Sequence, residues 1–267
     1  MRIKIFQVDA FTDRLFGGNP AAVCPLDKWL PDELLQQIAI ENNLAETVFF
    51  VKLPSGAFHI RWFTPEHEID LCGHATLASA FVLFDRLGHP GDRIDLESVS
   101  GPLSVKRVGK LLELDFPSRP PQPAQLPELI QRSLNIAPKE VWKARDYVLV
   151  YQDEQEVLDL QPDAHLLDGI NIAPAGLVAT ARSKSFPADF ISRYFTPQAS
   201  VFEDPATGSA HCSLVPFWAE RMGKTELQAL QVSRRQGAFS CSLTDDRVLI
   251  RGKAVLFLEG EVVLDVG

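Results

Sequence analysis

The chain has 267 residues, of which 46% are hydrophobic and 23% are charged, as in a globular protein with a substantial core. Its formal net charge of −9 argues against a nucleic-acid partner, because binding to phosphates requires a basic face. A small anionic substrate is compatible with this charge, since helix N-termini and a few basic residues can hold an anion.

The cysteines and histidines show no metal-binding spacing. There is no C-x-x-C pair and no H-E-x-x-H sequence, so we expect neither a metal site nor a disulfide framework. Residues 1–11 alternate charged and apolar side chains, unlike a signal peptide, and the longest apolar run, 71–84, is too short to cross a bilayer. We therefore expect a cytoplasmic protein without a membrane partner. The scattered cysteines are Cys24, Cys72, Cys212 and Cys241.

The first half combines short strands with two helices. Residues 2–9 and 57–63 alternate in polarity, which predicts half-buried strands. A Gly-Gly-Asn-Pro sequence at 17–20 predicts a turn before another short strand. Pro31 is expected to open a helix, and a second helix from about Gly73 to Leu87 is apolar nearly all round, so it should be buried. Further strands are expected near Glu46 and at 93–98, 101–107 and 111–116.

Five prolines between residues 117 and 127 mark the best candidate for a linker. Beyond it we expect a helix at 126–134 and another from about Thr207 to Met222, which Pro216 should kink or end. Strands are expected at 147–151, 176–181, 231–234, 247–251 and 254–265.

Strands and helices do not alternate strictly, which argues against a doubly wound parallel fold. The sequence predicts an α+β protein of two pseudo-symmetric domains, each a curved, mostly antiparallel sheet wrapped around a central helix. The first domain is expected at 1–116, completed by the last strand at about 254–267, and the second at 117–253.

One stretch of sequence occurs twice. Residues 63–84 read FTPEHEIDLCGHATLASAFVLF, and residues 195–217 read FTPQASVFEDPATGSAHCSLVPF. Both copies begin with Phe-Thr-Pro and pass through a short turn into a run of small and apolar residues. Such a repeat indicates two similar halves, and we expect the active site between them, where the paired turns meet.

Each of these turns, Cys72-Gly73-His74 and Asp204 to Ser209, is expected at the start of a helix. Free backbone N–H groups and the positive end of the helix dipole could hold a carboxylate or an enolate there without a cofactor. The alternative is structural, because Asp204 and Thr207 are also ordinary N-cap residues. The repetition favours the functional interpretation.

Two further side chains could transfer protons. His74, at a helix start, would be poised near neutral pH, although a lone histidine there is often structural. Glu46 is flanked by apolar residues, so desolvation would make it a usable base; the alternative is an exposed carboxylate. We expect the other histidines to be surface or strand-face residues: His59, His67, His89, His165 and His211.

Five motifs stand in a specific order and spacing. They are Asn19-Pro20-Ala21-Ala22-Val23, Asn43-Leu44-Ala45-Glu46-Thr47, Cys72-Gly73-His74-Ala75-Thr76, Glu203-Asp204-Pro205-Ala206-Thr207-Gly208-Ser209-Ala210 and Gln236-Gly237. Together they resemble the PhzF-like isomerase family of phenazine biosynthesis over essentially the whole chain. That family is similar in fold to diaminopimelate epimerase, with two pseudo-symmetric halves and the active site between them.

The resemblance implies a cofactor-independent isomerase that moves a proton on a small, anionic carbon acid, in a biosynthetic process and as a homodimer. Glu46 would be the general acid/base, with His74, Asp204 and Ser209 as polar catalytic partners and no metal. The stretch after Gln236-Gly237 lacks an arginine that relatives often carry, so the recognition of a substrate carboxylate stays open. Residues expected to contact substrate are Asn19, Cys72, Gly73, Thr207, Gly208, Gln236 and Gly237.

Two alternatives remain from other classes. Related epimerases and racemases use two cysteines, and Cys72 stands where the first would be, but Ala206 occupies the matching place in the second copy. A two-thiol mechanism is therefore disfavoured, and Cys72 is expected to be a small residue of the pocket wall. The other alternative is a non-enzymatic ligand-binding protein on the same fold.

Overall fold

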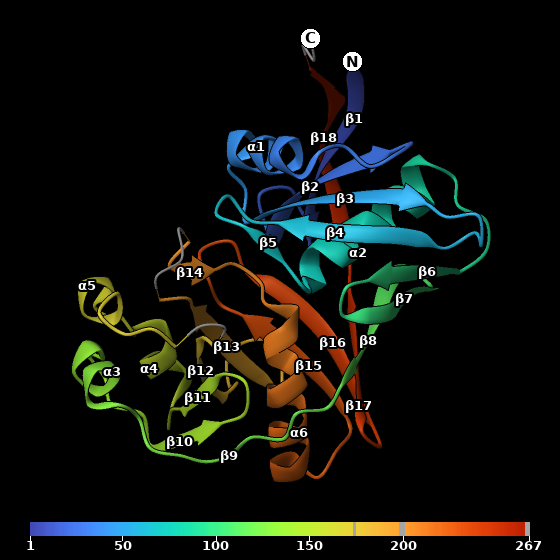
Figure 1. Cartoon of the computed structure of the whole chain (residues 1–267). Helices are drawn as coiled ribbons and strands as arrows, with labels where there is room; N and C mark the ends of the chain where they lie inside the picture. Colours follow the sequence, from blue (N-terminus) through green and yellow to red (C-terminus); the bar gives the residue numbers. More distant parts are fainter. Residues whose placement is uncertain (173–174, 198–200, 265–267) are drawn as a thin grey trace. The chain divides into compact units, whose positions relative to one another are not determined.

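The computed structural model describes residues 1–172, 175–197 and 201–264, which form two compact units. Unit 1 comprises Met1–Asp115 and Arg251–Gly267, and unit 2 comprises Phe116–Ile250. Figure 1 shows the chain coloured along its sequence. Residues 265–267 of the expected last strand and residues 198–200 of the second repeat lie outside the described residues.

Unit 1 is built on a mixed sheet. Its strand β1 pairs antiparallel with β2 and β18, and β2 pairs in parallel with β3. The strand β4 pairs with β3 and β5 antiparallel and with β6 in parallel, and β6, β7 and β8 continue antiparallel. The strands are β1 (Arg2–Ala10), β2 (Asn19–Leu26), β3 (Glu46–Lys52), β4 (Phe58–Phe63), β5 (Glu68–Ile69), β6 (Arg93–Ser98), β7 (Gly101–Val108), β8 (Leu111–Pro117) and β18 (Ala254–Val263).

The helix α2 (Gly73–Phe81) is the buried centre of unit 1, as the apolar pattern predicted. Every residue from Gly73 to Ala80 is buried, and α2 contacts β1, β2, β3, β7 and β18. Hydroxyls inside this helix bond back to its own carbonyls, Thr76 Oγ1 to Cys72 O at 2.5 Å and Ser79 Oγ to Ala75 O at 2.8 Å. The expected α-helix to Leu87 instead ends in a π-helical turn, η1 (Val82–Arg86).

The predicted helix after Pro31 is α1 (Asp32–Asn42), which buries Leu35, Ile38 and Ala39. It ends at Asn43, whose φ of 48° is left-handed and terminates the helix before β3 begins. Among the described residues, no helix is long and apolar enough to cross a membrane.

Unit 2 has a second mixed sheet. The strands β9 to β13 are joined in sequence order, antiparallel except for the parallel pair β11–β12, and β13 also pairs with β14 and, in parallel, with β15. The strands are β9 (Gln122–Pro123), β10 (Glu140–Lys143), β11 (Tyr147–Val150), β12 (Leu177–Arg182), β13 (Phe190–Phe195), β14 (Glu203–Asp204), β15 (Glu226–Gln231), β16 (Gly237–Thr244) and β17 (Arg247–Gly252). The helices are α3 (Glu128–Ser133), α4 (Glu154–Leu158), α5 (Ala164–Leu167) and α6 (His211–Met222).

The helix α6 continues through Pro216, so the expectation that this proline ends the regular helix is wrong. Proline cannot donate to the carbonyl four residues earlier, which here belongs to Cys212. That carbonyl accepts the backbone N–H of Arg119 at 2.8 Å instead. The helix also starts at His211 rather than Thr207, because a 3₁₀ turn, η2 (Gly208–Ala210), precedes it.

The strand predicted at 231–234 is also wrong. The strand β15 lies earlier, at Glu226–Gln231, and it pairs antiparallel with β16, which was not predicted. Leucine, glutamine and glutamate dominate β15, and these residues are better helix formers than strand formers. Pairing with β13 and β16 and the burial of Leu227 and Ala229 decide its conformation.

Candidate active site

Glu46 is the first residue of β3, where the chain leaves α1. In the parallel register of β2 and β3, it lies opposite Ala21. The side-chain amide of Asn42 donates to Thr47 Oγ1 at 3.0 Å, which ties the end of α1 to the start of β3. The Glu46 side chain is only 15% exposed, so the exposed-carboxylate interpretation of the sequence is wrong.

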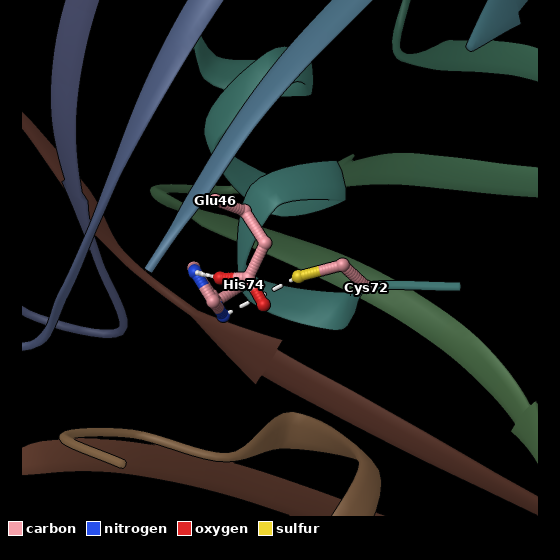
Figure 2. A group of neighbouring side chains, drawn as sticks. All are labelled: Glu46, Cys72 and His74. Atoms are coloured by element: carbon pink, nitrogen blue, oxygen red, sulfur yellow. Dashed lines mark hydrogen bonds and ion pairs between the residues drawn. The ribbon is translucent and has the colours of Figure 1, made fainter. Parts of the chain in front are cut away.

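His74 lies in the first turn of α2 and is buried. Its Nε2 is 2.8 Å from Glu46 Oε2, and its Nδ1 is 3.1 Å from the amide nitrogen of Asn19 and 3.5 Å from the Cys72 sulfur. Figure 2 shows Glu46, Cys72 and His74 converging on one point. A neutral ring would accept from the Asn19 amide nitrogen at Nδ1 and carry its proton on Nε2, facing Glu46, whereas a charged ring donates from both nitrogens and requires the Asn19 amide oxygen at Nδ1.

The contact between Glu46 and His74 is an ion pair by distance but not a hydrogen bond of regular angle. Neither Glu46 Oε2 nor His74 Nε2 has a hydrogen-bond partner among the described residues. Buried polar atoms are nearly always hydrogen-bonded, so two adjacent exceptions are unusual. These atoms retain hydrogen-bonding capacity that a substrate could use.

Electrostatics favour a charged histidine at this place. Burial by itself would lower the pKa of His74, but its interactions with Cys72 and Glu46 outweigh burial and hold that pKa well above its ordinary value. Burial, and then the Glu46 carboxylate, raise the pKa of the Cys72 thiol. Cys72 is therefore a neutral thiol near neutral pH, and the charged form of His74 is favoured beside Glu46.

The predicted residues of unit 2 lie on a turn that begins at Asp204. The hydroxyl of Thr207 donates to the Asp204 carboxylate. Thr207 makes no side-chain cap bond, so it does not act as the ordinary N-cap that the structural interpretation required. Gly208 is buried and Ser209 is half-buried within the 3₁₀ turn η2.

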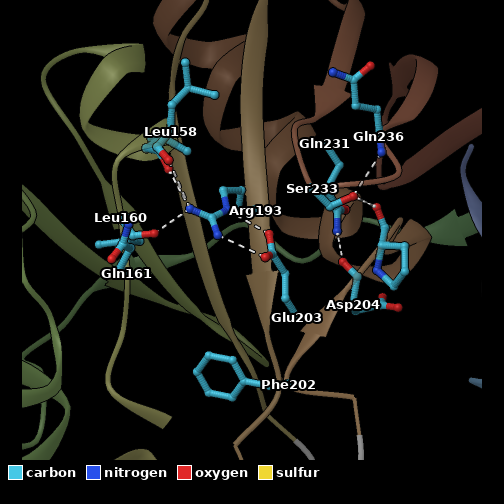
Figure 3. A network of polar contacts seen from close by, with 12 residues as sticks. Leu158, Leu160, Gln161, Arg193, Phe202, Glu203, Asp204, Gln231, Ser233 and Gln236 are labelled. Atoms are coloured by element: carbon cyan, nitrogen blue, oxygen red, sulfur yellow. Dashed lines mark hydrogen bonds and ion pairs between the residues drawn. The ribbon is translucent and has the colours of Figure 1, made fainter.

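Gln231, which the sequence did not single out, holds this turn in place. Its Oε1 accepts the backbone N–H of Thr207 at 2.8 Å. Its Nε2 donates to the Asp204 carbonyl at 2.6 Å (Figure 3). The side chain is 1% exposed. A glutamine 24 residues beyond Thr207 in the sequence carries no local signal of this contact.

Gln236 and Gly237 lie beside the same turn through their backbones. Ser233 Oγ donates to the Pro205 carbonyl at 2.7 Å and accepts the backbone N–H of Gln236 at 3.1 Å (Figure 3). A Cβ on Gly237 would lie 2.5 Å from that of Ala206, so only glycine allows this approach. These contacts show how both residues support the turn; contact with substrate stays a prediction.

His211 corrects one expectation, since it is fully buried rather than on the surface. Its Nδ1 lies 3.0 Å from the Thr207 carbonyl, to which it donates, and its ring lies 3.9 Å from that of Phe239. Burial lowers the pKa of His211 to about 4. The histidine is therefore a neutral support of the Thr207 turn.

The predicted site residues thus form one group in each unit. Glu46, Cys72, Gly73, His74 and Asn19 gather around the start of α2 in unit 1. In unit 2, the turn from Asp204 to Ser209 adjoins Gln236 and Gly237.

Comparison with known proteins identifies the family. The family model described as phenazine biosynthesis-like protein matches residues 8–260. The chain belongs to this family. An uncharacterised isomerase of Pseudomonas aeruginosa is 50% identical over 99% of this chain and 100% of its own length. Other curated relatives are also named isomerases, including a second Pseudomonas aeruginosa protein that is 45% identical.

Solved structures agree with this assignment. A PhzF family protein of Enterococcus faecalis has a TM-score of 0.93 and 43% identity, covering 99% of this chain and 100% of that one. A predicted epimerase of Pseudomonas aeruginosa is 20% identical with a TM-score of 0.73, covering 98% of this chain and 100% of that one, and shows the fold alone. The predicted α+β fold of diaminopimelate epimerase type is confirmed.

Proposed function

We propose that the protein is a cofactor-independent isomerase that moves a proton on a small, anionic carbon acid, with Glu46 as the general acid/base. The curated relatives are named isomerases, which supports the reaction class. The observation that carries the proposal is the half-buried Glu46 carboxylate 2.8 Å from a buried histidine, with neither atom in a regular hydrogen bond.

In this reaction Glu46 takes a proton from a carbon next to an unsaturated or carbonyl group. The C–H bond breaks, its electron pair spreads into the conjugated system, and an O–H bond forms on Glu46. The O–H bond on Glu46 then breaks as a proton passes to a nearby carbon, and exchange of the Glu46 proton with solvent before this step brings solvent hydrogen into the product. The His74 imidazolium lies close enough to stabilise negative charge that develops on the substrate.

We assign Asp204 and Ser209 as further polar groups of the same reaction, and the backbone of Gly73 and Gly208 as contacts for the anion. Support comes from the resemblance of the motifs and from the two hydrogen bonds by which Gln231 holds the turn that begins at Asp204. By the same resemblance we propose that the protein is a homodimer in a biosynthetic process, and we keep the cytoplasmic location expected from the sequence as part of the proposal.

The thiol mechanism of the epimerases is less well supported. Cys72 carries a buried neutral thiol, and the equivalent position in the second repeat is Ala206, fully buried against Gly237. A two-base reaction needs one thiol from each repeat, and the position that would supply the second thiol is an alanine. We therefore place Cys72 in the wall beside Glu46.

Proton exchange with solvent tests the proposal directly. Small carboxylic acids with an acidic C–H next to a double bond or carbonyl are incubated with the protein in deuterated water, and deuterium incorporation is followed by NMR. Glu46→Gln should lower the incorporation on the order of a thousandfold or more, because the amide cannot accept the proton. Glu41→Gln, an exposed position on α1, is the matched control and should retain full exchange.

Equal exchange by Glu46→Gln and the unaltered protein would remove Glu46 from the mechanism. Tight binding of an acid without exchange of any carbon-bound proton would instead favour a ligand-binding protein.

A further inference from the structure

The residues around His74 form a donor set that sequence spacing did not reveal. Glu46, Cys72 and His74 each offer one metal-ligating atom, and these three atoms all lie within 4.8 Å of one another. No second group of this kind occurs among the described residues. Carboxylate oxygen, imidazole nitrogen and thiolate sulfur are the ligand types of protein zinc sites.

The separation of two of these atoms fits a tetrahedral ion. Zinc lies about 2.3 Å from thiolate sulfur and about 2.0–2.1 Å from imidazole nitrogen, so two such ligands lie roughly 3.5 Å apart. Cys72 Sγ and His74 Nδ1 are 3.5 Å apart. Cys72 is the residue before α2 and His74 is in its first turn, so the helix start fixes this spacing.

Burial adds a second, independent argument. Cys72 and His74 are buried, Glu46 is 15% exposed, and Glu46 Oε2 and His74 Nε2 form an ion pair but no regular hydrogen bond. Because folding has already gathered and desolvated these side chains, a cation finds ligands that need little further ordering. To bind, it must displace the Asn19 amide, which lies 3.1 Å from Nδ1.

We propose that Glu46, Cys72 and His74 bind Zn²⁺, and that the bound ion inhibits the enzyme. On binding, the S–H bond of Cys72 breaks, its proton passes to solvent, and the electron pair on sulfur bonds the metal. The charged His74 likewise releases its Nδ1 proton to solvent, and the electron pair on Nδ1 bonds the metal. A carboxylate that donates an electron pair to zinc is a weaker base and is held away from the substrate carbon, so inhibition rests on the proposed role of Glu46.

Direct binding is measured first, without any substrate. The chelator-treated, metal-free protein competes for Zn²⁺ with a zinc-sensitive dye, and one equivalent should bind. Cys72→Ser should weaken binding on the order of a hundredfold, since a hydroxyl is a poor substitute for thiolate. Cys212→Ser removes another buried thiol and should leave the affinity unchanged.

Cobalt supplies a spectroscopic readout of sulfur ligation in the unaltered protein itself. Co²⁺ added to the unaltered protein should give a sulfur-to-metal charge-transfer absorption, lost in Cys72→Ser and retained in Cys212→Ser. Absence of stoichiometric binding, or equal zinc affinity in Cys72→Ser and the unaltered protein, overturns the site.

Inhibition is then measured as deuterium exchange with and without Zn²⁺, followed by removal of the metal with a chelator. Loss of exchange with zinc and its recovery with chelator are expected. Full exchange by zinc-saturated protein overturns the inhibitory role. An absence of exchange from the metal-free protein would count against the proposed function, while the binding experiment still decides the metal site.

Discussion

At the scale of single residues, His74 is held from both sides of its ring. Asn19 and Cys72 lie at Nδ1, and Glu46 lies at Nε2. The second buried histidine, His211, has a different environment, because it faces a carbonyl and an aromatic ring rather than a carboxylate. One ring is therefore charged and the other neutral, although both begin buried helices.

The neutral state of His211 predicts a loss of stability in acid. Its folded pKa of about 4 is below the ordinary value of 6.5, so the unfolded chain binds a proton first as pH falls. Neutral His211 contributes fully to the free energy of unfolding above about pH 6.5. This contribution should fall by roughly 3 kcal/mol by pH 4. Urea unfolding at several pH values measures it, with His211→Asn as the variant that no longer titrates.

The free energy of unfolding is compared at each pH between His211→Asn and the unaltered protein. The difference reports His211 alone, because both proteins contain the carboxylates that titrate over the same range. His67→Gln, at an exposed position, should keep the pH dependence of the unaltered protein. Identical pH slopes for His211→Asn and the unaltered protein would show that His211 binds a proton as readily in the folded protein as in the unfolded chain.

At the scale of elements, the two helix starts are supported differently. The start of α2 lies among strands of its own sheet, and its polar groups contact Asn19 on β2 and Glu46 on β3. The turn before α6 is held from one side by the end of β15 and the start of β16, through Gln231 and Gly237. The turn before α6 therefore depends on the β15–β16 pair, which the sequence did not predict.

Gly237→Ala should disturb that support. The added methyl would meet the Ala206 Cβ at 2.5 Å, so the turn must shift, and we expect a loss of about 1–3 kcal/mol in the free energy of unfolding. Combining it with Ala206→Gly removes the opposing atom and should recover part of the loss. Urea unfolding of both single variants and the double variant measures this coupling.

Gly260→Ala on β18 is the matched control, because its nearest neighbour, Leu258 Cδ2, lies 3.8 Å away. Strictly additive effects of Gly237→Ala and Ala206→Gly would argue against the contact.

At the scale of the whole molecule, the sequence predicted the fold better than the site. A run of small and apolar residues placed α2, and the order of short strands and helices, with the repeat and its family motifs, indicated the α+β architecture. Glu46 and His74 are 28 positions apart, and only the packing of β2, β3 and α2 brings their atoms to 2.8 Å. Gln231 and the β15–β16 pair were missed because their structure depends on tertiary contacts that override local propensity.

Removal of the last strand, β18, should destabilise unit 1. Unit 1 is discontinuous in sequence, and β18 pairs with β1 from Arg2↔Val263 to Ala10↔Ala254. A chain that ends at Lys253 leaves β1 as an unpaired edge and removes a neighbour of α2. Hydrogen exchange should therefore show amides of β1 and β2 losing protection, while β11 to β13 serve as the internal reference in unit 2 and retain theirs. Equal loss in both units would mean that they unfold as one cooperative body, and full protection of β1 would mean that β18 does not stabilise unit 1.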